Sequence, residues 1–310
     1  MATTRAPAGA FQVLRRKEVL WGYGFLAPIL VLMGLFVVYG LYFVVKISFF
    51  KWDGVDPETM VFRGFRNYVL LFSDTNFLMA VLNAVIFLVV TVSVQMFAGL
   101  MVALLLRPKL FGHRFFKALF YIPVALSTTV IATTFAAFYE PNFGVLNSVL
   151  TSDFGKTLGV SGLAHSWLGD PSTALGAVIV ANIFQWMGAQ MIFYIAGLTT
   201  ISDEVFEAAQ IDGAGFWPTL TQVVWPSLWP THTTVIILGM VGAIKTFDIV
   251  WLLTQGGPGN ATQFPATMLY QSVAQNFQAG YGASISVVMI LLCIGLSAVQ
   301  ISFNNRKREA

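Results

Sequence analysis

Six long apolar runs limit what this chain can fold into more than any other feature of its sequence. A helix needs about 20 apolar residues to cross a bilayer, and backbone polar groups in lipid must bond within their own segment. Continuous runs also lack the alternation of a membrane β-barrel strand. The runs cover residues 21–47, 77–105, 116–139, 173–199, 233–255 and 282–303. The sequence therefore predicts an all-α membrane protein with six transmembrane helices.

The composition supports lipid as the solvent of this chain. Charged residues make up 10% of its 310 residues and hydrophobic residues 57%, whereas a soluble domain carries about 25% charged residues. A basic stretch at 15–17 precedes the first run, as in a signal peptide, but that run is too long to be one. We expect three parts: a cytoplasmic tail over 1–20, a transmembrane domain over 21–303 and a cytoplasmic tail over 304–310.

The distribution of Lys and Arg predicts the orientation, because cytoplasmic loops of membrane proteins carry an excess of both. With the N-terminus inside, eleven of the 17 Lys and Arg residues lie in cytoplasmic segments and five in outer segments. We therefore expect a multi-pass protein of a bacterial or archaeal cytoplasmic (inner) membrane, with both termini in the cytoplasm. These anchors explain the net charge of +3, and we expect no nucleic-acid partner. The cytoplasmic segment 200–232 differs, since it holds no Lys or Arg.

No catalytic constellation is evident in the sequence. The triplet Gly155-Lys156-Thr157 matches the end of a phosphate-binding loop, but that motif needs a further glycine where the chain has Leu150. The three histidines fall in three different segments and have no zinc-binding spacing. We therefore expect a transport subunit rather than an enzyme, with no cofactor and no metal site of its own.

Two charged residues stand inside the fifth apolar run, where each costs about 2.5–3.5 kcal/mol on insertion scales. Lys245 and Asp248 are three residues apart and are expected to share one face of a continuous helix. Two interpretations stay open. The pair forms a mutual ion pair that lowers the cost of insertion, lines a water-filled translocation path, or does both.

A group of hydrogen-bonding residues in the fourth run favours a sugar site. Asn182, Gln185 and Trp186 have the spacing of one helix face. Amides bond to hydroxyl groups and an indole stacks on an apolar sugar face, but Asn and Gln also join membrane helices to one another. Thr128 in the third run either lines the same path or bonds to its own helix backbone.

Residues 203–213 predict a short polar helix within the cytoplasmic segment 200–232. Ser202 suits the N-cap position and Gly213 suits the position after the C-cap. An isolated helix of this length is marginal in water, so we expect it to dock against a partner. Its small residues allow a close approach, and Glu207 offers a charge to a basic group.

The sequence EAAQIDGAGFWPTLTQVVWPSLWP, residues 207–230, resembles the EAA signature of permease subunits of binding-protein-dependent ABC importers. The sequence FDIVWLLTQGGPGNAT, residues 247–262, resembles carbohydrate-uptake permeases of the maltose permease (MalF) type. The likeness covers about residues 20–305. It implies the type I ABC importer permease fold, with the helix at 203–213 as a coupling helix seated on a cytoplasmic ATPase. The contact residues that it implies are Glu207, Ala208, Ala209, Asp212, Gly213 and Ala214.

The resemblance also implies partners and a solute. The importer is expected to contain a second permease subunit in a heterodimer, two copies of an ABC ATPase that bind ATP and Mg²⁺, and an extracytoplasmic solute-binding protein. ATP binding then turns the permease pair from inward- to outward-facing. The family's sugar-binding residues fall near Thr128, Asn182, Gln185, Trp186, Ala243 and Thr246. Asn182 matches in type, Thr128 approximately, and Gln185 and Trp186 do not, so a di- or oligosaccharide other than maltose is compatible with the pattern.

Two alternatives stay open. Lys245 beside this group is compatible with an anionic solute, such as a glycerol phosphate, in the same family. A secondary transporter that uses an ion gradient through Lys245 and Asp248 belongs to a different class. A secondary transporter has no reason to display a docking helix without Lys or Arg, and this favours the importer.

Overall fold

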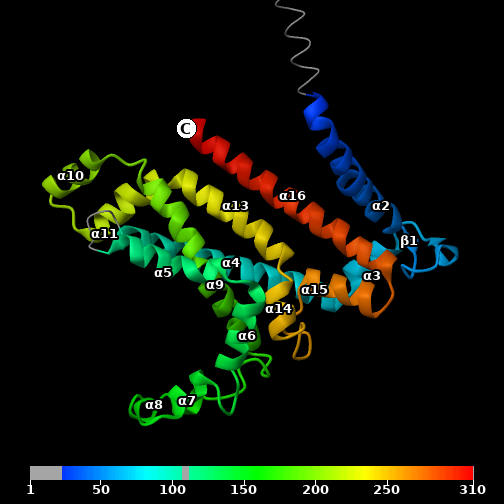
Figure 1. Ribbon diagram of the computed structural model, residues 1–310, viewed down its shortest axis with the longest axis horizontal. Helices are drawn as coiled ribbons and strands as arrows, with labels where there is room; N and C mark the ends of the chain where they lie inside the picture. Colours follow the sequence, from blue (N-terminus) through cyan, green and yellow to red (C-terminus); the bar gives the residue numbers. More distant parts are fainter. Residues whose placement is uncertain (1–22, 107–111, 310) are drawn as a thin grey trace, which may run out of the picture.

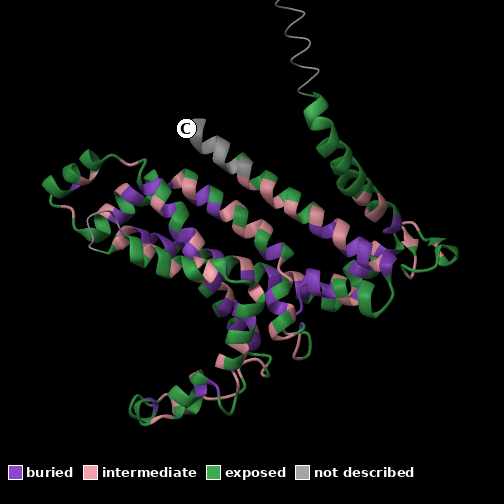
Figure 2. Ribbon diagram, in the orientation of Figure 1, coloured by how far each residue is buried: buried purple, intermediate pink, exposed green. Residues whose placement is uncertain are grey.

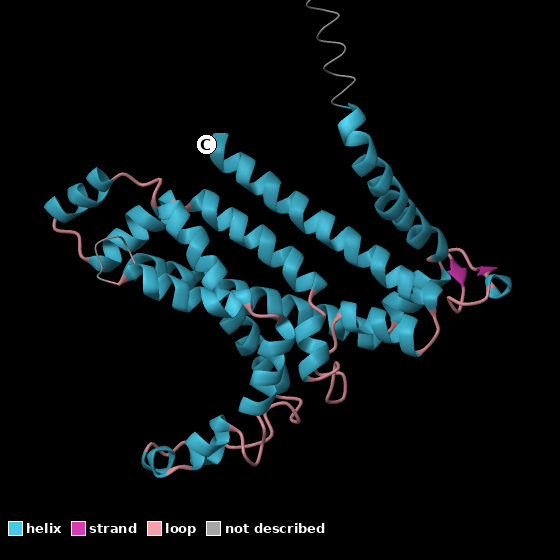
Figure 3. Cartoon of the chain, viewed as in Figure 1, coloured by secondary structure: helices cyan, strands magenta, loops and turns pink. Residues whose placement is uncertain are grey.

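The computed structural model describes residues 23–106 and 112–309, and helices dominate it (Figures 1 and 3). The expected tail over 1–20 lies outside the described residues. The long helices are α2 (Tyr39–Ile47, which continues the helix from Tyr23), α4 (Thr75–Leu105), α5 (His113–Ala125), α6 (Thr128–Phe138), α9 (Ala174–Leu198), α13 (Trp229–Lys245) and α16 (Ala279–Glu309). The residues expected as a C-terminal tail thus continue α16 as far as Glu309.

Short elements connect these helices. They are η1 (Met33–Val38), β1 (Phe50–Lys51), η2 (Pro57–Thr59), β2 (Val61–Phe62), α3 (Arg66–Ser73), α7 (Val145–Thr151), α8 (Asp153–Thr157), η3 (Ser161–Leu163), α10 (Asp203–Ile211), α11 (Phe216–Pro218), η4 (Thr219–Val224), α12 (Trp225–Ser227), α14 (Asp248–Leu253), α15 (Pro265–Tyr270) and η5 (Gln271–Gln275). β1 and β2 form an antiparallel ribbon in which Phe50 lies opposite Phe62.

Six spans result when each of two bent helix pairs counts as one, in agreement with the prediction. In the described part of the chain, four helices are long and apolar enough to cross a membrane alone: Tyr23–Ile47, Thr75–Leu105, Ala174–Leu198 and Ala279–Gln300. The bent pairs are His113–Ala125 with Thr128–Phe138, at 93°, and Phe216–Ser227 with Trp229–Lys245, at 71°.

The third span is not the continuous helix expected over 116–139. Leu126 is extended after α5, and Ser127 caps α6 by accepting a hydrogen bond from the backbone N–H of Val130 at 3.4 Å. Pro123 lies in the last turn of α5 and has no N–H to donate. The proline and the capping serine together explain why this span bends.

The fifth span is not the continuous helix expected over 233–255. α13 ends at Lys245, Thr246 and Phe247 leave the helical conformation, and α14 begins at Asp248. Lys245 and Asp248 therefore belong to two separate helices, and the expectation that they share one helix face is wrong.

The core lies where α4, α9 and α13 pack together, and Figure 2 shows buried residues gathered there. Leu100, Tyr194, Val224 and Leu228 belong to one hydrophobic cluster, and each is at most 1% exposed. Helices in lipid associate through close van der Waals packing. Gly99 of α4 permits that packing, because a Cβ there would lie 2.9 Å from the Cβ of Gln190 in α9.

The first span lies apart from this core. None of the most apolar 18 residues within Tyr23–Ile47 is buried, and Figure 2 draws almost the whole helix as exposed. An apolar face of this size is covered by lipid or by another chain in a membrane protein. α2 meets the rest of the fold mainly through α16.

Candidate functional site

The short polar helix predicted at 203–213 is present as α10, Asp203–Ile211. Gly213 follows its C-cap with a φ of 74°. The backbone N–H of Ala214 donates to the carbonyl of Ala209 at 2.9 Å, and the N–H of Gly213 donates to that of Gln210 at 3.1 Å. This pair of bonds is a Schellman motif, which ends a helix at a left-handed glycine. Ser202 occupies the N-cap position, but its side chain makes no capping hydrogen bond.

The outer face of α10 is exposed, and its inner face holds it to the bundle. Ala209 is buried, and Phe206 packs against the core cluster of α4 and α9. Glu207, Ala208, Asp212 and Gly213 are exposed, and Ala214 is half-buried. Figure 1 places α10 at the end of the bundle where α9 ends and α13 begins, while β1 and α3 lie at the opposite end. Five of the six predicted contact residues thus lie on one projecting, acidic surface, whereas Ala209 faces the bundle and is not accessible to a partner.

A cavity of about 510 Å³ opens between α4, α9 and α13, and residues of α5, α6, α14 and the connection before α14 complete it. This volume suits a small organic ligand, since ligand pockets span about 300–1,000 Å³. All eight residues predicted for the solute path line it: Thr128, Asn182, Gln185, Trp186, Ala243, Lys245, Thr246 and Asp248. The structure therefore brings together residues from three separate apolar runs.

Hydrogen bonds between helices fix the amides of this cavity. Gln95 Nε2 donates to Asn182 Oδ1 at 3.2 Å and to the Asn182 carbonyl at 3.3 Å. Gln185 Nε2 donates to Thr128 Oγ1 at 3.2 Å. Thr128 therefore bonds to another helix, whereas its neighbours Thr133 and Thr134 bond to their own backbone. For Asn182 and Gln185 the sequence left interhelical bonding and cavity lining as alternatives, and the structure shows both.

Two side-chain amide oxygens at the cavity wall accept no hydrogen bond from the described residues. Gln185 is 2% exposed and Gln190 is 8% exposed. Within the described residues, the Oε1 atom of each has no hydrogen-bond partner in the protein. Both atoms are buried in this structure. An unpaired buried acceptor costs about 1–3 kcal/mol, so an O–H or N–H donor that reaches either oxygen when the cavity widens is stabilising.

The two charged side chains of the cavity do not pair with each other. Lys245 and Asp248 are both exposed, and no ion pair within 4.0 Å joins them in the described structure. Thr246 and Phe247 separate them in the chain. Both residues line the cavity, and the interpretation that they line a water-filled translocation path stays a prediction.

The sequence did not point to several of the residues that line the cavity. Gln95 and Gln190 are amides within apolar runs, and Tyr121 and Phe193 add exposed aromatic surface to the wall. The spacing within α9 offered a signal for Gln190, which follows Trp186 by four residues on the same helix. Gln95 lies in a different run from Asn182, so nothing in the sequence linked the two residues.

A folded arm, residues 140–173, projects from the bundle beyond α6 (Figure 1). Asn147 is buried there and uses both ends of its amide: Nδ2 donates to the carbonyls of Pro141 at 3.0 Å and His165 at 2.9 Å, and Oδ1 accepts from Trp167 Nε1 at 2.8 Å. At the base of the arm, the backbone N–H groups of Phe143 and Asn142 hold the pKa of Glu140 below its usual value. These bonds give the arm a defined shape.

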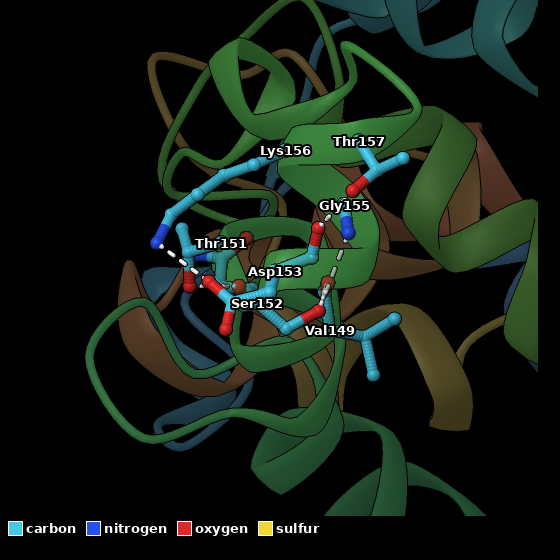
Figure 4. Close-up of polar contacts among 8 residues, drawn as sticks. Val149, Thr151, Ser152, Asp153, Gly155, Lys156 and Thr157 are labelled. Atoms are coloured by element: carbon cyan, nitrogen blue, oxygen red, sulfur yellow. Dashed lines mark hydrogen bonds and ion pairs between the residues drawn. The ribbon is translucent and has the colours of Figure 1, made fainter.

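The Gly155-Lys156-Thr157 triplet lies in this arm, and its polar groups are engaged locally (Figure 4). Lys156 Nζ lies 3.2 Å from Asp153 Oδ1, and Thr157 Oγ1 donates to the Asp153 carbonyl at 2.7 Å. The backbone N–H of Gly155 donates to Ser152 Oγ at 3.3 Å. These contacts belong to one short helix, α8, and not to a strand–loop–helix phosphate cradle.

Comparison with known proteins identifies relatives along most of the chain. A family model described as "Binding-protein-dependent transport system inner membrane component" matches residues 95–309. The probable ABC transporter permease protein YurN of Bacillus subtilis is 35% identical over 289 residues, which cover 93% of this chain and 97% of that protein. The trehalose/maltose transport system permease protein MalF of Thermococcus litoralis is 29% identical over 296 residues, which cover 96% and 97%.

Solved structures give the fold. Two structures of a bacterial ABC transporter for the acidic polysaccharide alginate, one of them in complex with an alginate pentasaccharide-bound periplasmic protein, match with a TM-score of 0.79. The matches cover 96% of this chain at 19% sequence identity, and 98% and 97% of the matched chains. They confirm the fold that the EAA resemblance implied. The chain is a multi-pass membrane protein that belongs to the family of inner membrane components of binding-protein-dependent transport systems.

Proposed function

We propose that this chain is the permease subunit of an ATP-driven importer, and that a sugar, a di- or oligosaccharide, crosses the membrane through the cavity lined by α4, α9 and α13. The observation that carries this proposal is the chemistry of that wall. It offers two unpaired buried carbonyl oxygens, on Gln185 and Gln190, beside the partly exposed ring of Trp186. Hydroxyl groups donate to such oxygens, and an apolar sugar face stacks on an indole.

The energy for transport comes from a separate ATPase in this proposal. The exposed acidic surface of α10 docks in a groove on that ATPase, and Glu207 meets a basic group there. Nucleotide and Mg²⁺ are bound by the ATPase, and this chain contributes no hydrolytic residue. The position of α10 at the end of the bundle, with Phe206 packed against the core cluster, supports this role, because a displacement of α10 then reaches the helices of the cavity.

The assembly includes further partners. A second permease subunit forms a heterodimer with this chain and covers helix faces, such as that of α2, which are exposed here. Two ATPase copies bind on the cytoplasmic side, where both termini lie. A solute-binding protein delivers the sugar from the other side. A periplasmic protein is bound in one of the solved alginate transporter structures, which supports such a partner.

A second candidate solute is an anionic sugar or a glycerol phosphate. The observation that favours it is Lys245, which lines the cavity without an ion pair within 4.0 Å in the described structure. Asp248 lines the same cavity and opposes an anion. The neutral sugar is therefore the better-supported solute.

Reconstitution tests the proposal. The chain, its partner permease, the ATPase and the binding protein are placed in liposomes, with the solute identified by mass spectrometry of the purified binding protein. The proposal expects uptake that requires ATP and persists when proton and sodium gradients are collapsed. Uptake driven by an ion gradient without ATP would contradict it. A phosphorylated solute on the binding protein would select the second candidate.

A further inference from the structure

His232 is a buried histidine that does not line the cavity. It lies in the first turn of α13 and is 1% exposed. Both of its ring nitrogens are engaged: Nδ1 lies 2.8 Å from the Tyr194 hydroxyl oxygen of α9, and Nε2 lies 3.0 Å from the Trp225 carbonyl oxygen of α12. One side chain thus joins three separate helices.

The partners determine which nitrogen carries the proton. A carbonyl oxygen only accepts, so Nε2 must carry the hydrogen that is donated to Trp225. A neutral imidazole has one N–H, and Nδ1 therefore accepts from the Tyr194 hydroxyl. The bonds run in one direction, from the tyrosine through the ring of His232 to the backbone of α12.

Packing reinforces these bonds. The ring of His232 lies against the ring of Trp225, and their centroids are 4.2 Å apart. The centroids of the His232 and Tyr194 rings are 5.5 Å apart. Trp225 and His232 stand on opposite sides of the 71° bend that separates α12 from α13. α9 is packed tightly on the same bend, because a Cβ on Gly197 would lie 2.4 Å from Thr231 Oγ1.

The junction of α9, α12 and α13 at His232 lies between α10 and the cavity. On one side, Leu220 and Val224 lead from the α10 loop into the core cluster that includes Tyr194. On the other side, Tyr194 follows Gln190 by one helical turn on α9, and Gln190 lines the cavity. A rigid shift of α12 therefore reaches the cavity wall through His232 and Tyr194.

We propose that His232 is a positioning residue that transmits movement of the α10–α12 segment to α9. The inference rests on the proposed function, since it assigns the route by which ATPase closure reaches the solute cavity. Without the ring, the loop moves when the ATPase closes but α9 no longer follows, so ATP is consumed with less uptake. The residue acts through α9 and does not touch the solute.

Four variants separate the contributions. His232→Leu removes both hydrogen bonds and keeps an apolar side chain. His232→Gln keeps an N–H donor for the Trp225 carbonyl, and His232→Asn keeps an acceptor for the Tyr194 hydroxyl. Tyr194→Phe removes only that hydroxyl. Tyr139→Phe is the matched control, because Tyr139 is also buried and donates to a carbonyl of α9, that of Ala177 at 3.2 Å.

The test measures solute taken up per ATP hydrolysed by the complete complex in liposomes, together with the yield of assembled complex. We expect His232→Leu to lower this ratio about five-fold or more, the range of typical coupling energies, while hydrolysis continues. His232→Gln, His232→Asn and Tyr194→Phe each keep one of the two hydrogen bonds and should lie between His232→Leu and the native ratio, and Tyr139→Phe should match the native ratio.

Two outcomes would overturn the inference. One is a native ratio in both His232→Leu and Tyr194→Phe. The other is a parallel fall of assembly, hydrolysis and uptake at a constant ratio, because a purely structural role gives that result. If His232→Leu does not assemble, Tyr194→Phe decides alone. Absence of ATP-driven uptake by the native complex would instead refute the proposed function.

Discussion

Replacement of Gln185 by leucine separates a ligand-binding role from a structural role. The variant loses the hydrogen bond from Nε2 to Thr128 Oγ1, and such a bond contributes about 0.5–1.5 kcal/mol to stability. It also removes the buried Oε1, which has no protein partner in the described structure, and an unsatisfied buried acceptor costs about 1–3 kcal/mol. The two contributions have opposite signs. The free energy of unfolding should therefore stay the same or rise slightly.

Transport should respond differently. If Oε1 accepts a hydroxyl of the solute, the leucine removes one hydrogen bond of about 0.5–1.5 kcal/mol. Since 1.4 kcal/mol corresponds to a factor of ten, we expect uptake at low solute concentration to fall about two- to ten-fold. The assay pairs initial uptake rates in liposomes with the thermal unfolding temperature of the purified complex.

Gln263 supplies the matched control. It is 3% exposed and its Oε1 also has no protein partner among the described residues, but it does not line the cavity. Gln263→Leu should leave uptake per assembled complex unchanged. Lower stability with normal uptake in Gln185→Leu would refute the reasoning, because Gln185 would then serve only to join α9 to α6.

Three further predictions concern α10, the cavity wall and the arm. Glu207→Lys should uncouple hydrolysis from uptake, because loss of a buried interface charge pair costs about 2–5 kcal/mol; normal uptake in inserted protein would rule out docking through this face. Trp186→Ala should weaken uptake while the ATPase still co-purifies, and an unchanged uptake rate and selectivity would exclude the ring from the path. Asn147→Leu should loosen the arm, since three hydrogen-bond partners lose their amide at about 1–3 kcal/mol for each one left buried. Limited proteolysis should then cut between residues 140 and 173 faster than in the native chain, and equal cleavage rates would contradict the role of Asn147.

The sequence predicted the features that depend on local chemistry. Apolar runs of about 20 residues locate the spans, because lipid excludes polar segments of that length. Gly213 marks the end of α10 correctly, since the left-handed conformation that closes the helix suits glycine. The EAA resemblance covers this same stretch and implied the fold that the structural comparison confirms.

The sequence analysis did not predict the breaks within the third and fifth spans, because apolar composition carries no information on where a helix bends or ends. Pro123 was a local signal for the bend before α6. No proline lies between Lys245 and Asp248, so the end of α13 had no comparable mark. That break places the two charges on separate elements, where the sequence had placed them on one face.

Contacts between distant segments were also beyond the sequence. Gln95 bonds to Asn182, 87 positions further along the chain, and neither residue predicts the other. Asn182, Gln185 and Trp186 of α9 were identified as a group because helical spacing is local. Their partners on α4 and α6 depend on how the helices pack, which a single sequence does not contain.

Protection of a cysteine at the cavity wall tests most directly whether the solute occupies this cavity. Ala189 lines the cavity on α9, and Ala189→Cys is made in a Cys293→Ala background, with Lys156→Cys on the exposed arm as the reference site. The rate of modification by a hydrophilic maleimide is measured in the assembled complex, with and without the sugar recovered from the binding protein. The account predicts that the sugar slows the reaction at position 189 and leaves position 156 unaffected. Equal modification rates at position 189 with and without the sugar, in a complex that takes it up, would place the path elsewhere.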